Sequence, residues 1–325
     1  AACPRLWLTS KVLTGWWPTA DIAHGIDGTL HAVVRPDAWT VSYMRLVSGY
    51  EGWSNPSLIE VVNDSEAYAI GDVKLDISPL DTIHVTWFQT AAEVDWNFWS
   101  VWYARSVDQG VTWEQVEKLG NPLSGSSDIA VDGQGNVILV WNRNIWEADG
   151  RWFRWSGDDG KTWSSPVRLY PRLSSASGDT GGYGFAVDSA GSLHMVNSVE
   201  GEGTGGRAAA FYFQWSDSGW STPMYLLGRH AHYARIVVTE GNRLHFFALA
   251  GEEHSIWHRE VRTKAPFIDP EPVPSAEPTE VPPTSLPVTP YTSTLNPQSY
   301  SHNYAEDSVA EVTVDTSWKP LIVAV

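Results

Sequence analysis

The sequence predicts an all-β protein: a β-propeller of four-stranded antiparallel sheets, followed by a proline-rich stalk and a short C-terminal β segment. Three observations support this prediction. The 325 residues include 19 tryptophans, and aromatic side chains favour half-buried strand surfaces. A strand-like segment recurs at intervals of 53, 54, 56 and 51 residues, and such a period with several short strands per unit is typical of propeller blades. A tryptophan-containing octapeptide also recurs in consecutive units.

The recurring strand carries an apolar residue that is followed by histidine in four of five copies. The apolar residues are Leu30, Ile83, Val137, Leu193 and Leu244, and the histidines are His31, His84, His194 and His245. The third copy has Ile138 instead of histidine. Because metal ligation needs converging side chains, we interpret this position as a buried histidine bonded to neighbouring backbone. The sequence therefore predicts no metal site and no cofactor.

The octapeptide has the pattern Ser-x-Asp-x-Gly-x-Thr-Trp. Its recurring positions are Ser106, Asp108, Gly110, Thr112 and Trp113 in one copy and Ser156, Asp158, Gly160, Thr162 and Trp163 in the other. A degenerate copy covers residues 216–220. Short polar side chains bond nearby backbone amides, and glycine accepts the positive φ of a tight turn. The pattern predicts a hairpin whose tryptophan packs between sheets.

The repeats divide the chain into three parts. Residues 1–268 are predicted to form the propeller, with 5–13 as an outer strand that completes the last blade. This arrangement gives five blades, and six is the alternative if the C-terminal part contributes strands. Residues 269–297 are rich in Pro, Thr and Ser, which favours an extended linker. Residues 298–325 are predicted to contain a C-terminal β-strand segment.

The composition limits the partners. A formal net charge of −17 argues against nucleic acid, because that binding needs Lys and Arg to neutralise phosphates. No apolar run is long enough for a transmembrane span, and a single Cys excludes a disulfide framework within the chain. The Ser/Thr-rich stalk is typical of surface proteins. We therefore expect a secreted or cell-surface, extracellular location.

The two intact octapeptides resemble Asp-boxes, the bacterial-neuraminidase repeats (BNR) of the sialidase-like β-propeller family. The similarity covers residues 5–268 and implies the propeller fold. For an active enzyme it further implies three arginines that bind a substrate carboxylate, a Tyr nucleophile paired with Glu, and an Asp acid/base. The early Phe/Tyr-Arg-Ile-Pro segment of these enzymes is missing here; residues 34–37 read Val-Arg-Pro-Asp instead.

Five residues are candidates for such a catalytic site. They are Arg35, Asp37, Tyr183, Glu200 and Arg235. Arg143 and Arg207 are further arginines that could face the propeller axis. None of these residues lies in a recognisable family motif, and a fold by itself does not imply a function.

Three functions follow as hypotheses. The favoured one is an extracellular non-catalytic propeller that acts as a cell-surface, adhesive or filament-forming subunit. In this hypothesis residues 308–325 mediate self-assembly as a strand donated to a neighbouring subunit. The alternatives are an exo-sialidase or related glycoside hydrolase, and a lectin-like propeller that binds carbohydrate through exposed tryptophans. A glycan is the expected ligand in both alternatives.

Overall fold

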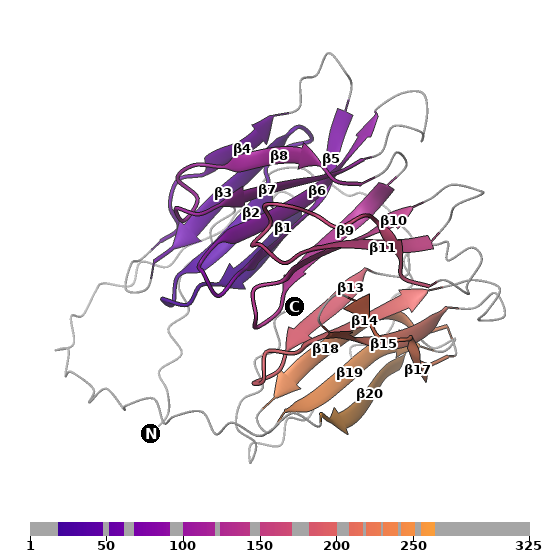
Figure 1. Cartoon of the computed structure of the whole chain (residues 1–325). Helices are drawn as coiled ribbons and strands as arrows, with labels where there is room; N and C mark the ends of the chain where they lie inside the picture. The colour runs from indigo at the N-terminus through magenta and orange to yellow at the C-terminus, as the bar shows by residue number, and fades with distance from the viewer. Residues whose placement is uncertain are drawn as a thin grey trace, which may run out of the picture. The chain divides into compact units, whose positions relative to one another are not determined.

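The computed structural model of the chain describes most of the predicted propeller. The described residues are 19–47, 52–61, 68–91, 100–120, 124–143, 150–170, 182–199, 208–216, 219–228, 230–239, 242–250 and 255–263. Over these ranges the chain forms twenty β-strands and no helix (Figure 1), and none of its elements is a helix able to cross a membrane. The chain divides into two compact units, residues 1–271 and 272–325, and every described residue belongs to the first unit.

The strands form five antiparallel sheets in chain order. The first sheet contains β1 (Thr19–His24), β2 (Leu30–Arg35), β3 (Thr40–Leu46) and β4 (Ser57–Val61). The second contains β5 (Tyr68–Ile77), β6 (Ile83–Ala91), β7 (Ser100–Ser106) and β8 (Glu114–Lys118). The third contains β9 (Ser124–Val131), β10 (Val137–Arg143), β11 (Gly150–Ser156) and β12 (Val167–Arg168).

The last two sheets depart from four strands. The fourth sheet contains β13 (Tyr183–Val187), β14 (Leu193–Val199), β15 (Ala209–Ser216), β16 (Gly219–Trp220) and β17 (Met224–Leu227), with both β16 and β17 paired to β15. The fifth contains β18 (His232–Thr239), β19 (Arg243–Ala250) and β20 (Ser255–Arg262). No described strand pairs with the outer edge of β20. The predicted fourth strand, residues 5–13, lies outside the described residues, as do residues 269–325.

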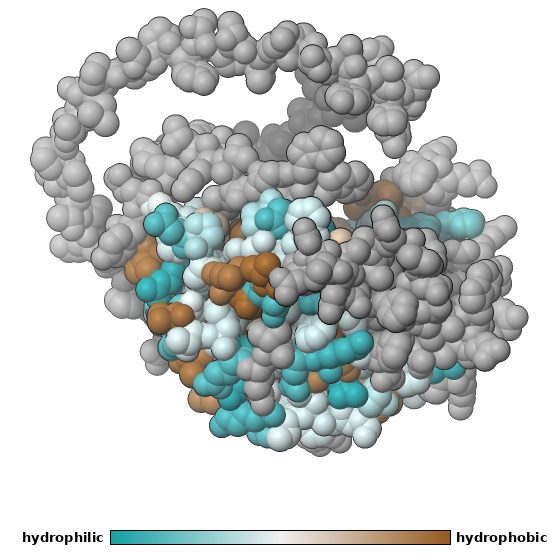
Figure 2. All heavy atoms as spheres, turned by 90° about the horizontal axis from the view of Figure 1, so that it is seen from above, coloured by the Kyte–Doolittle hydropathy of each residue, from teal (hydrophilic) through white to brown (hydrophobic). Residues whose placement is uncertain are grey.

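This arrangement confirms the all-β fold of repeated antiparallel sheets. Within each sheet, strands that follow one another in the chain mostly lie next to one another. Hydrophobic clusters connect each sheet to the next. The clusters lie between the first and second sheets, the second and third, the third and fourth, and the fourth and fifth. On the face seen in Figure 2, apolar side chains form small groups among polar ones. The core therefore lies between sheets, where non-directional apolar burial holds them together.

Each octapeptide folds as a closed hydrogen-bonded turn. In the second copy the Ser156 hydroxyl donates to Asp158 Oδ1 (2.7 Å) and accepts the N–H of Gly160 (2.9 Å). Asp158 also accepts the backbone N–H and hydroxyl of Thr162, at 2.8 and 2.7 Å. The first copy has the same bonds between Ser106, Asp108, Gly110 and Thr112. The predicted turn is therefore present in both copies.

The turns pack against the sheet that precedes them. Trp163 lies 4.9 Å from the ring of Tyr103, and Trp113 lies 5.5 Å from Tyr43, both edge to face. Gly160 has φ +81°, and a Cβ there would overlap the Tyr103 hydroxyl. This position needs glycine for two reasons, since positive φ strains other residues and the tyrosine leaves no room. The tryptophans are partly buried, as expected for a ring between two sheets.

His31, His84 and His194 are buried, as predicted, whereas His245 is only partly buried. The partners of all four differ from the backbone groups that we predicted. His31, His84 and His194 each have Nδ1 within 2.6–2.8 Å of a tyrosine hydroxyl on the next strand of the same sheet, respectively Tyr43, Tyr103 and Tyr212. In the fifth sheet His258 replaces the tyrosine, 3.0 Å from His245. Among the described residues, no group of three or more potential metal-ligating side chains converges.

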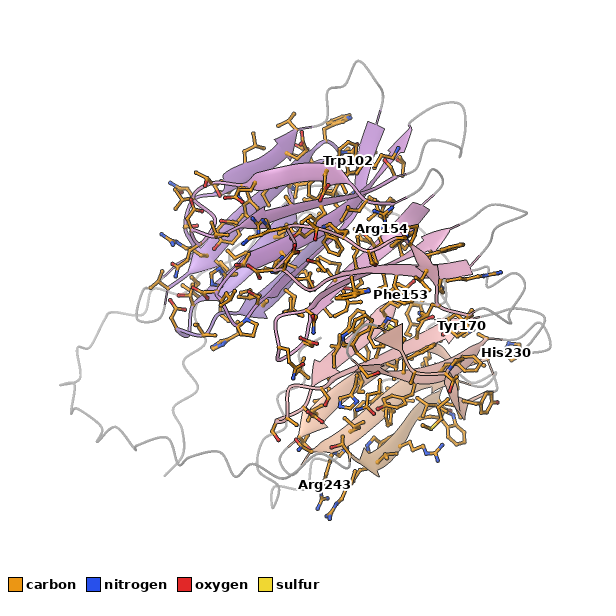
Figure 3. The ribbon with its side chains drawn as sticks, viewed as in Figure 1. Trp102, Phe153, Arg154, Tyr170, His230 and Arg243 are labelled. Atoms are coloured by element: carbon orange, nitrogen blue, oxygen red, sulfur yellow. The ribbon has the colours of Figure 1, made fainter. Side chains whose placement is uncertain are left out.

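The third sheet lacks both members of this pair. Ile138 occupies the histidine position, and Phe153, which pairs with Val140, occupies the tyrosine position. Both side chains are buried in the cluster between the third and fourth sheets, and Phe153 is labelled in Figure 3. The turn that would pack on this pair is the degenerate copy in the fourth sheet. Its Trp220 instead packs 5.2 Å from Trp215 of its own sheet.

The stability contributions of His31 and Tyr43 should be coupled, because each side chain is the hydrogen-bond partner of the other. Tyr43→Phe should destabilise the protein by about 1–3 kcal/mol, because a buried ring nitrogen of His31 loses its partner. The double variant His31→Ile with Tyr43→Phe recreates the apolar pair of the third sheet, so it should cost less than the sum of the single changes. Urea unfolding of the four proteins measures this coupling. Additive costs would contradict it.

Candidate functional site

The innermost strands of all five sheets line one central cavity of about 410 Å³. β1, β5, β9, β13 and β18 each contribute residues, so the cavity draws on the whole repeat rather than on one sheet. Its lining residues are Thr19, Ala20, Asp72, Val73, Lys74, Ser126, Ser127, Asp128, Gly182, Tyr183, Tyr233 and Arg235. The volume is within the range of small-molecule sites.

The strand registers place charged residues at one level of the innermost strands. In each sheet, one residue of the innermost strand pairs with the residue that follows the repeated histidine position by two on the next strand. These residues are Asp21, Lys74, Asp128, Gly184 and Arg235. Two are acidic and two basic, so this level carries both kinds of ionisable side chain although the chain carries −17 overall. Such a mixed set can both donate and accept hydrogen bonds.

Three of the innermost strands are bulged where they line the cavity. The register shifts at Gly71 and Asp72 in β5, at Ser126 in β9, and at Tyr233 and Ala234 in β18. A bulge re-aims a side chain, and bulges are over-represented next to functional sites. Asp72, Ser126 and Tyr233 are all lining residues. The sheets are thus irregular at the level of the cavity.

The backbone at two bulges also has unusual dihedrals. Ser126 has φ +42° and Tyr233 φ +52°, and residues held at positive φ cost energy and cluster at binding sites. Gly182, at the start of the β13 segment, has φ +75°. Tyr233 is 55% exposed, so this bulge presents an aromatic ring to solvent beside the cavity.

Lys74 lies among carboxylates at the centre of this group. Burial alone would lower the pKa of Lys74, but Asp128, Asp21 and Asp72 attract its ammonium and together hold that pKa above its ordinary value. Asp21 accepts the backbone N–H of Leu75 on the neighbouring sheet at 3.1 Å. Lys74 is therefore a permanent cation and a hydrogen-bond donor at neutral pH.

The cavity carboxyl of Asp128 has an unusual protonation equilibrium. Burial raises the pKa of Asp128 to about 7, although attraction to Lys74 acts in the opposite direction. Its Oδ1 accepts the backbone N–H of Ile129 at 2.9 Å. Near neutral pH this carboxyl exists in both forms, so it can accept a hydrogen bond or donate one to a ligand hydroxyl.

Two of the five candidate residues, Tyr183 and Arg235, line the same cavity. The Tyr183 hydroxyl donates to Asn142 Oδ1 at 2.8 Å, and the Arg151 guanidinium lies 5.6 Å from the centre of its ring. Burial raises the pKa of the Tyr183 hydroxyl. Arg235 is exposed and donates to the backbone carbonyl of Ala234 at 2.9 Å.

The structure places the other candidates elsewhere. Arg35 bonds through its guanidinium to the carbonyl of Ile70. Asp37 accepts the backbone N–H of Trp39 and the hydroxyl of Thr40, so it stabilises the turn between β2 and β3. Neither residue lines the cavity. Glu200 and Arg207 lie outside the described residues.

Sequence reasoning missed Asp72, Lys74, Asp128 and Tyr233. A usable signal was present for two of them, because aligning the repeats on the histidine position puts Lys74 and Asp128 at the level of Arg235. Tyr233 reaches the cavity through a bulge, and a bulge breaks the alternation from which strand faces are read.

Solved structures that are similar to this chain include a trans-sialidase and two polysaccharide lyases. The intramolecular trans-sialidase from Ruminococcus gnavus, solved with oseltamivir carboxylate, has a TM-score of 0.51 and 10% identity over 77% of this chain and 86% of its own. The polysaccharide lyase Uly1 has a TM-score of 0.50 and 13% identity over 76% of this chain and 58% of its own. An ulvan lyase bound to a GlcA–Rha3S saccharide has a TM-score of 0.50, 12% identity, and coverage of 74% and 63%.

These similarities establish the fold, a sialidase-like β-propeller architecture shared with polysaccharide lyases. The chain spans 58% of Uly1 and 63% of the ulvan lyase. No family model matches the sequence, and no curated protein matches it. Membership of the Asp-box sequence family therefore stays a prediction.

The carboxyl of Asp76 should make the stability of the fold depend on pH. Burial raises the pKa of Asp76, on β5, to about 6, although it accepts the N–H groups of Val131 and Ile77. The folded state thus binds this proton more tightly than the unfolded chain, and stability falls as pH rises from about 4 through 6. In the Asp76→Asn variant, the free energy of unfolding should fall by about 1–3 kcal/mol less over this pH range than in the parent protein. Urea unfolding at pH 4, 6 and 8 measures it; parallel profiles for both proteins would contradict it.

Proposed function

We propose that this chain is an extracellular carbohydrate-binding propeller whose ligand occupies the central cavity. The main support for the proposal is that strand bulges, residues at positive φ and charged side chains all occur at the lining of this cavity. Regular strands would serve stability alone, yet Asp72, Ser126 and Tyr233 leave the regular register at the cavity. Strain of this kind persists where the surrounding structure imposes it, and it is characteristic of functional sites.

The chemistry of the lining suits a sugar. Lys74 and Arg235 donate hydrogen bonds, Asp72 and Asp128 accept them, and the serine hydroxyls do both. A polyhydroxylated ring offers donors and acceptors in every direction, so it can satisfy such a mixed set. Tyr233 adds an exposed aromatic face beside these groups. The glycan-active proteins that share the fold support the same ligand class.

Binding fits the geometry better than sialoside hydrolysis. The sialidase resemblance implies three arginines, whereas Arg235 is the one arginine among the described residues lining the cavity. It also implies an activated tyrosine. The buried Tyr183 hydroxyl instead has a raised pKa and a neutral amide partner in Asn142, and a nucleophile needs a lowered pKa or an adjacent base.

The adhesive, filament-forming and donor-strand hypotheses concern the C-terminal part of the chain. Residues 298–325 lie outside the described residues, and no observation on the described part favours self-assembly. A cell-surface setting remains part of the proposal because residues 269–297 are rich in Pro, Thr and Ser, a composition typical of the stalks of surface proteins.

Tyr233→Asn should weaken glycan binding at least tenfold. Asparagine tolerates positive φ, so the variant removes the aromatic ring with little change to the bulge. The measurement is a glycan array with the parent protein, followed by titration of the strongest glycan against each variant. Arg235→Ala should also weaken binding, because it removes a donor from the cavity.

Two variants serve as controls. Tyr225→Asn removes a similarly exposed tyrosine (59%) from β17, outside the cavity lining. Arg243→Ala removes the arginine that extends from the far end of the fifth sheet (Figure 3) and pairs with Glu260. Both should bind like the parent. An array without any bound glycan, or equal losses in cavity and control variants, would contradict the proposal.

The parent should not turn over a fluorogenic sialoside. Tyr183→Phe and Arg235→Ala identify the origin of any signal, because a sialidase site would lose activity in both. Turnover that disappears in these variants would assign hydrolysis to the cavity and replace the binding proposal.

A further inference from the structure

The fifth sheet departs from the first, second and fourth sheets at the histidine position, because a second histidine takes the place of the tyrosine. His245 Nδ1 lies 3.0 Å from His258 Nε2, and the two rings are stacked with centroids 5.2 Å apart and planes 10° apart. His245 pairs with Glu260, and Phe247 pairs with His258. The two histidines are therefore diagonal neighbours on one face of the sheet.

The spacing of these two nitrogens fits a shared metal ion. A bond from zinc to an imidazole nitrogen is about 2.0–2.1 Å long, so two bonds at roughly 90–110° to each other hold their nitrogens about 2.9–3.4 Å apart. The observed separation of 3.0 Å lies within this range. Both nitrogens can therefore bind one ion while the two strands keep their positions.

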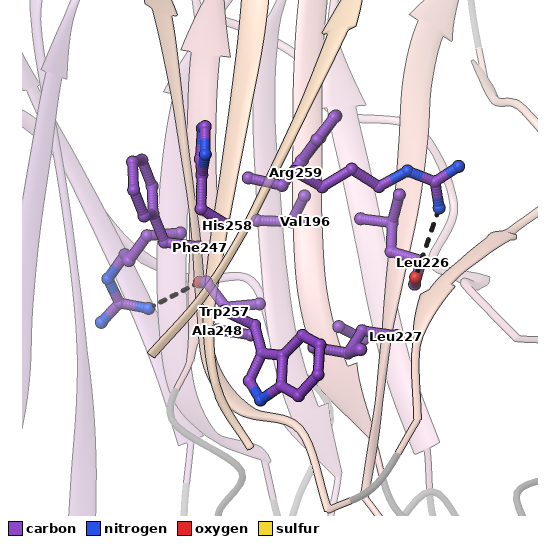
Figure 4. Close-up of a pocket in the computed structure, with 12 residues that line it drawn as sticks. Val196, Leu226, Leu227, Phe247, Ala248, Trp257, His258 and Arg259 are labelled. Carbon is purple, nitrogen blue, oxygen red and sulfur yellow. Dashed lines mark hydrogen bonds between the residues drawn. The ribbon is translucent and has the colours of Figure 1, made fainter. Parts of the chain in front are cut away.

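Neighbouring side chains orient both rings. The Thr239 hydroxyl lies 2.9 Å from His245 Nε2. When it accepts the Nε2–H, it leaves the Nδ1 lone pair for a metal, as the outer partners of metal-binding histidines do. His258 stacks on Phe247 with ring centroids 4.8 Å apart, and Figure 4 shows these two side chains next to each other, among the residues that line an apolar pocket of about 170 Å³. A metal ion replaces the proton between the two histidines, and His258 then carries its proton on Nδ1.

The histidine pair is open to solvent, unlike the histidine–tyrosine pairs of the other sheets. His258 is exposed and His245 is partly buried, whereas His31, His84 and His194 are fully buried. Metal sites with fewer than four protein ligands complete their coordination with water. Water can reach an ion at His245 and His258, so two histidines suffice as the fixed part of a site.

A carboxylate lies next to the pair. Glu260 holds the register position opposite His245 on the same face, and it forms an ion pair with Arg243 at 3.2 Å. Exposed ion pairs contribute little to stability, so Glu260 can leave Arg243 and bind a metal ion. Among the described residues no third ligand is already in place, and the carboxylate must rotate to reach the ion.

We propose that His245 and His258 bind one late first-row transition-metal ion, Zn²⁺ or Cu²⁺, with Glu260 and water as the further ligands. Imidazole suits these ions, whereas Ca²⁺ and Mg²⁺ prefer oxygen ligands. Neither histidine lines the central cavity, so this site goes beyond the proposed function. The prediction of no metal site from the sequence rested on the repeated histidines alone, and the partner His258 lies 13 residues beyond His245.

Calorimetric titration of the full chain with Zn²⁺ and, separately, with Cu²⁺ tests the site. The parent should bind one ion at this site, and excess Mg²⁺ should not displace it. His258→Tyr should weaken binding by about tenfold or more, since even the loss of an outer-shell partner costs that much. This variant restores the histidine–tyrosine pair of the other sheets, so it keeps the hydrogen bond and the fold. The control His24→Asn removes an exposed histidine of β1 and should bind like the parent.

Electron paramagnetic resonance of the Cu²⁺ complex identifies the ligands without any variant. The parent spectrum should show two coordinated imidazole nitrogens, and fewer than two would overturn the proposal. Equal affinities of the parent and His258→Tyr would also overturn it, because the ion would then be bound elsewhere, as would a loss of binding in His24→Asn. Binding of neither ion would have the same consequence. Binding of only one of the two ions supports the site and identifies its metal.

Discussion

The contact between each octapeptide turn and the tyrosine of the preceding sheet is the interaction on which the repeat depends. The turn fixes its own shape through four hydrogen bonds, and it then places a glycine and a tryptophan against a ring that is held by a buried histidine. In the second and third sheets the contact extends further, since Asp159 of the turn lies 3.2 Å from His84 and bonds Thr82. Local turn chemistry thus becomes contact between sheets.

Between the third and fourth sheets, the histidine–tyrosine pair and the turn that would contact it are both missing. Where His and Tyr become Ile138 and Phe153, the next turn loses its Asp and most of its pattern, and tryptophans fill the junction instead. Polar pairs and apolar packing are alternative solutions at one position, because a buried polar group is tolerated only with its partner. Removing both partners together is cheaper than removing one.

The sequence was sufficient for the strands, the turns and the repeat, since each depends on short-range patterns such as Gly160 at positive φ or the alternation around Val137. Three of the four repeated histidines were correctly predicted as buried. Their tyrosine partners lie 12 to 19 residues away, and only the strand register brings them together. The site was harder to predict. Tyr183 and Arg235 were selected from the sequence because of their residue types. Lys74 and Asp128 are recognised only when the strand registers are compared. Asp72 and Tyr233 reach the cavity through bulges that break the alternation of strand faces.

This difference separates the residues that fix the fold from those that supply chemistry. Positions facing neighbouring sheets repeat closely, because each junction must meet the same packing requirement. The innermost level is free of that requirement, and there the repeat diverges into Asp21, Lys74, Asp128, Gly184 and Arg235. Divergence within an otherwise regular array is where a ligand can be recognised, since a ring of identical side chains would offer the same group in every direction. The first and last sheets both contribute to this level, since Thr19 and Ala20 line the cavity together with Tyr233 and Arg235, so residues from the two ends of the described strands meet at one site.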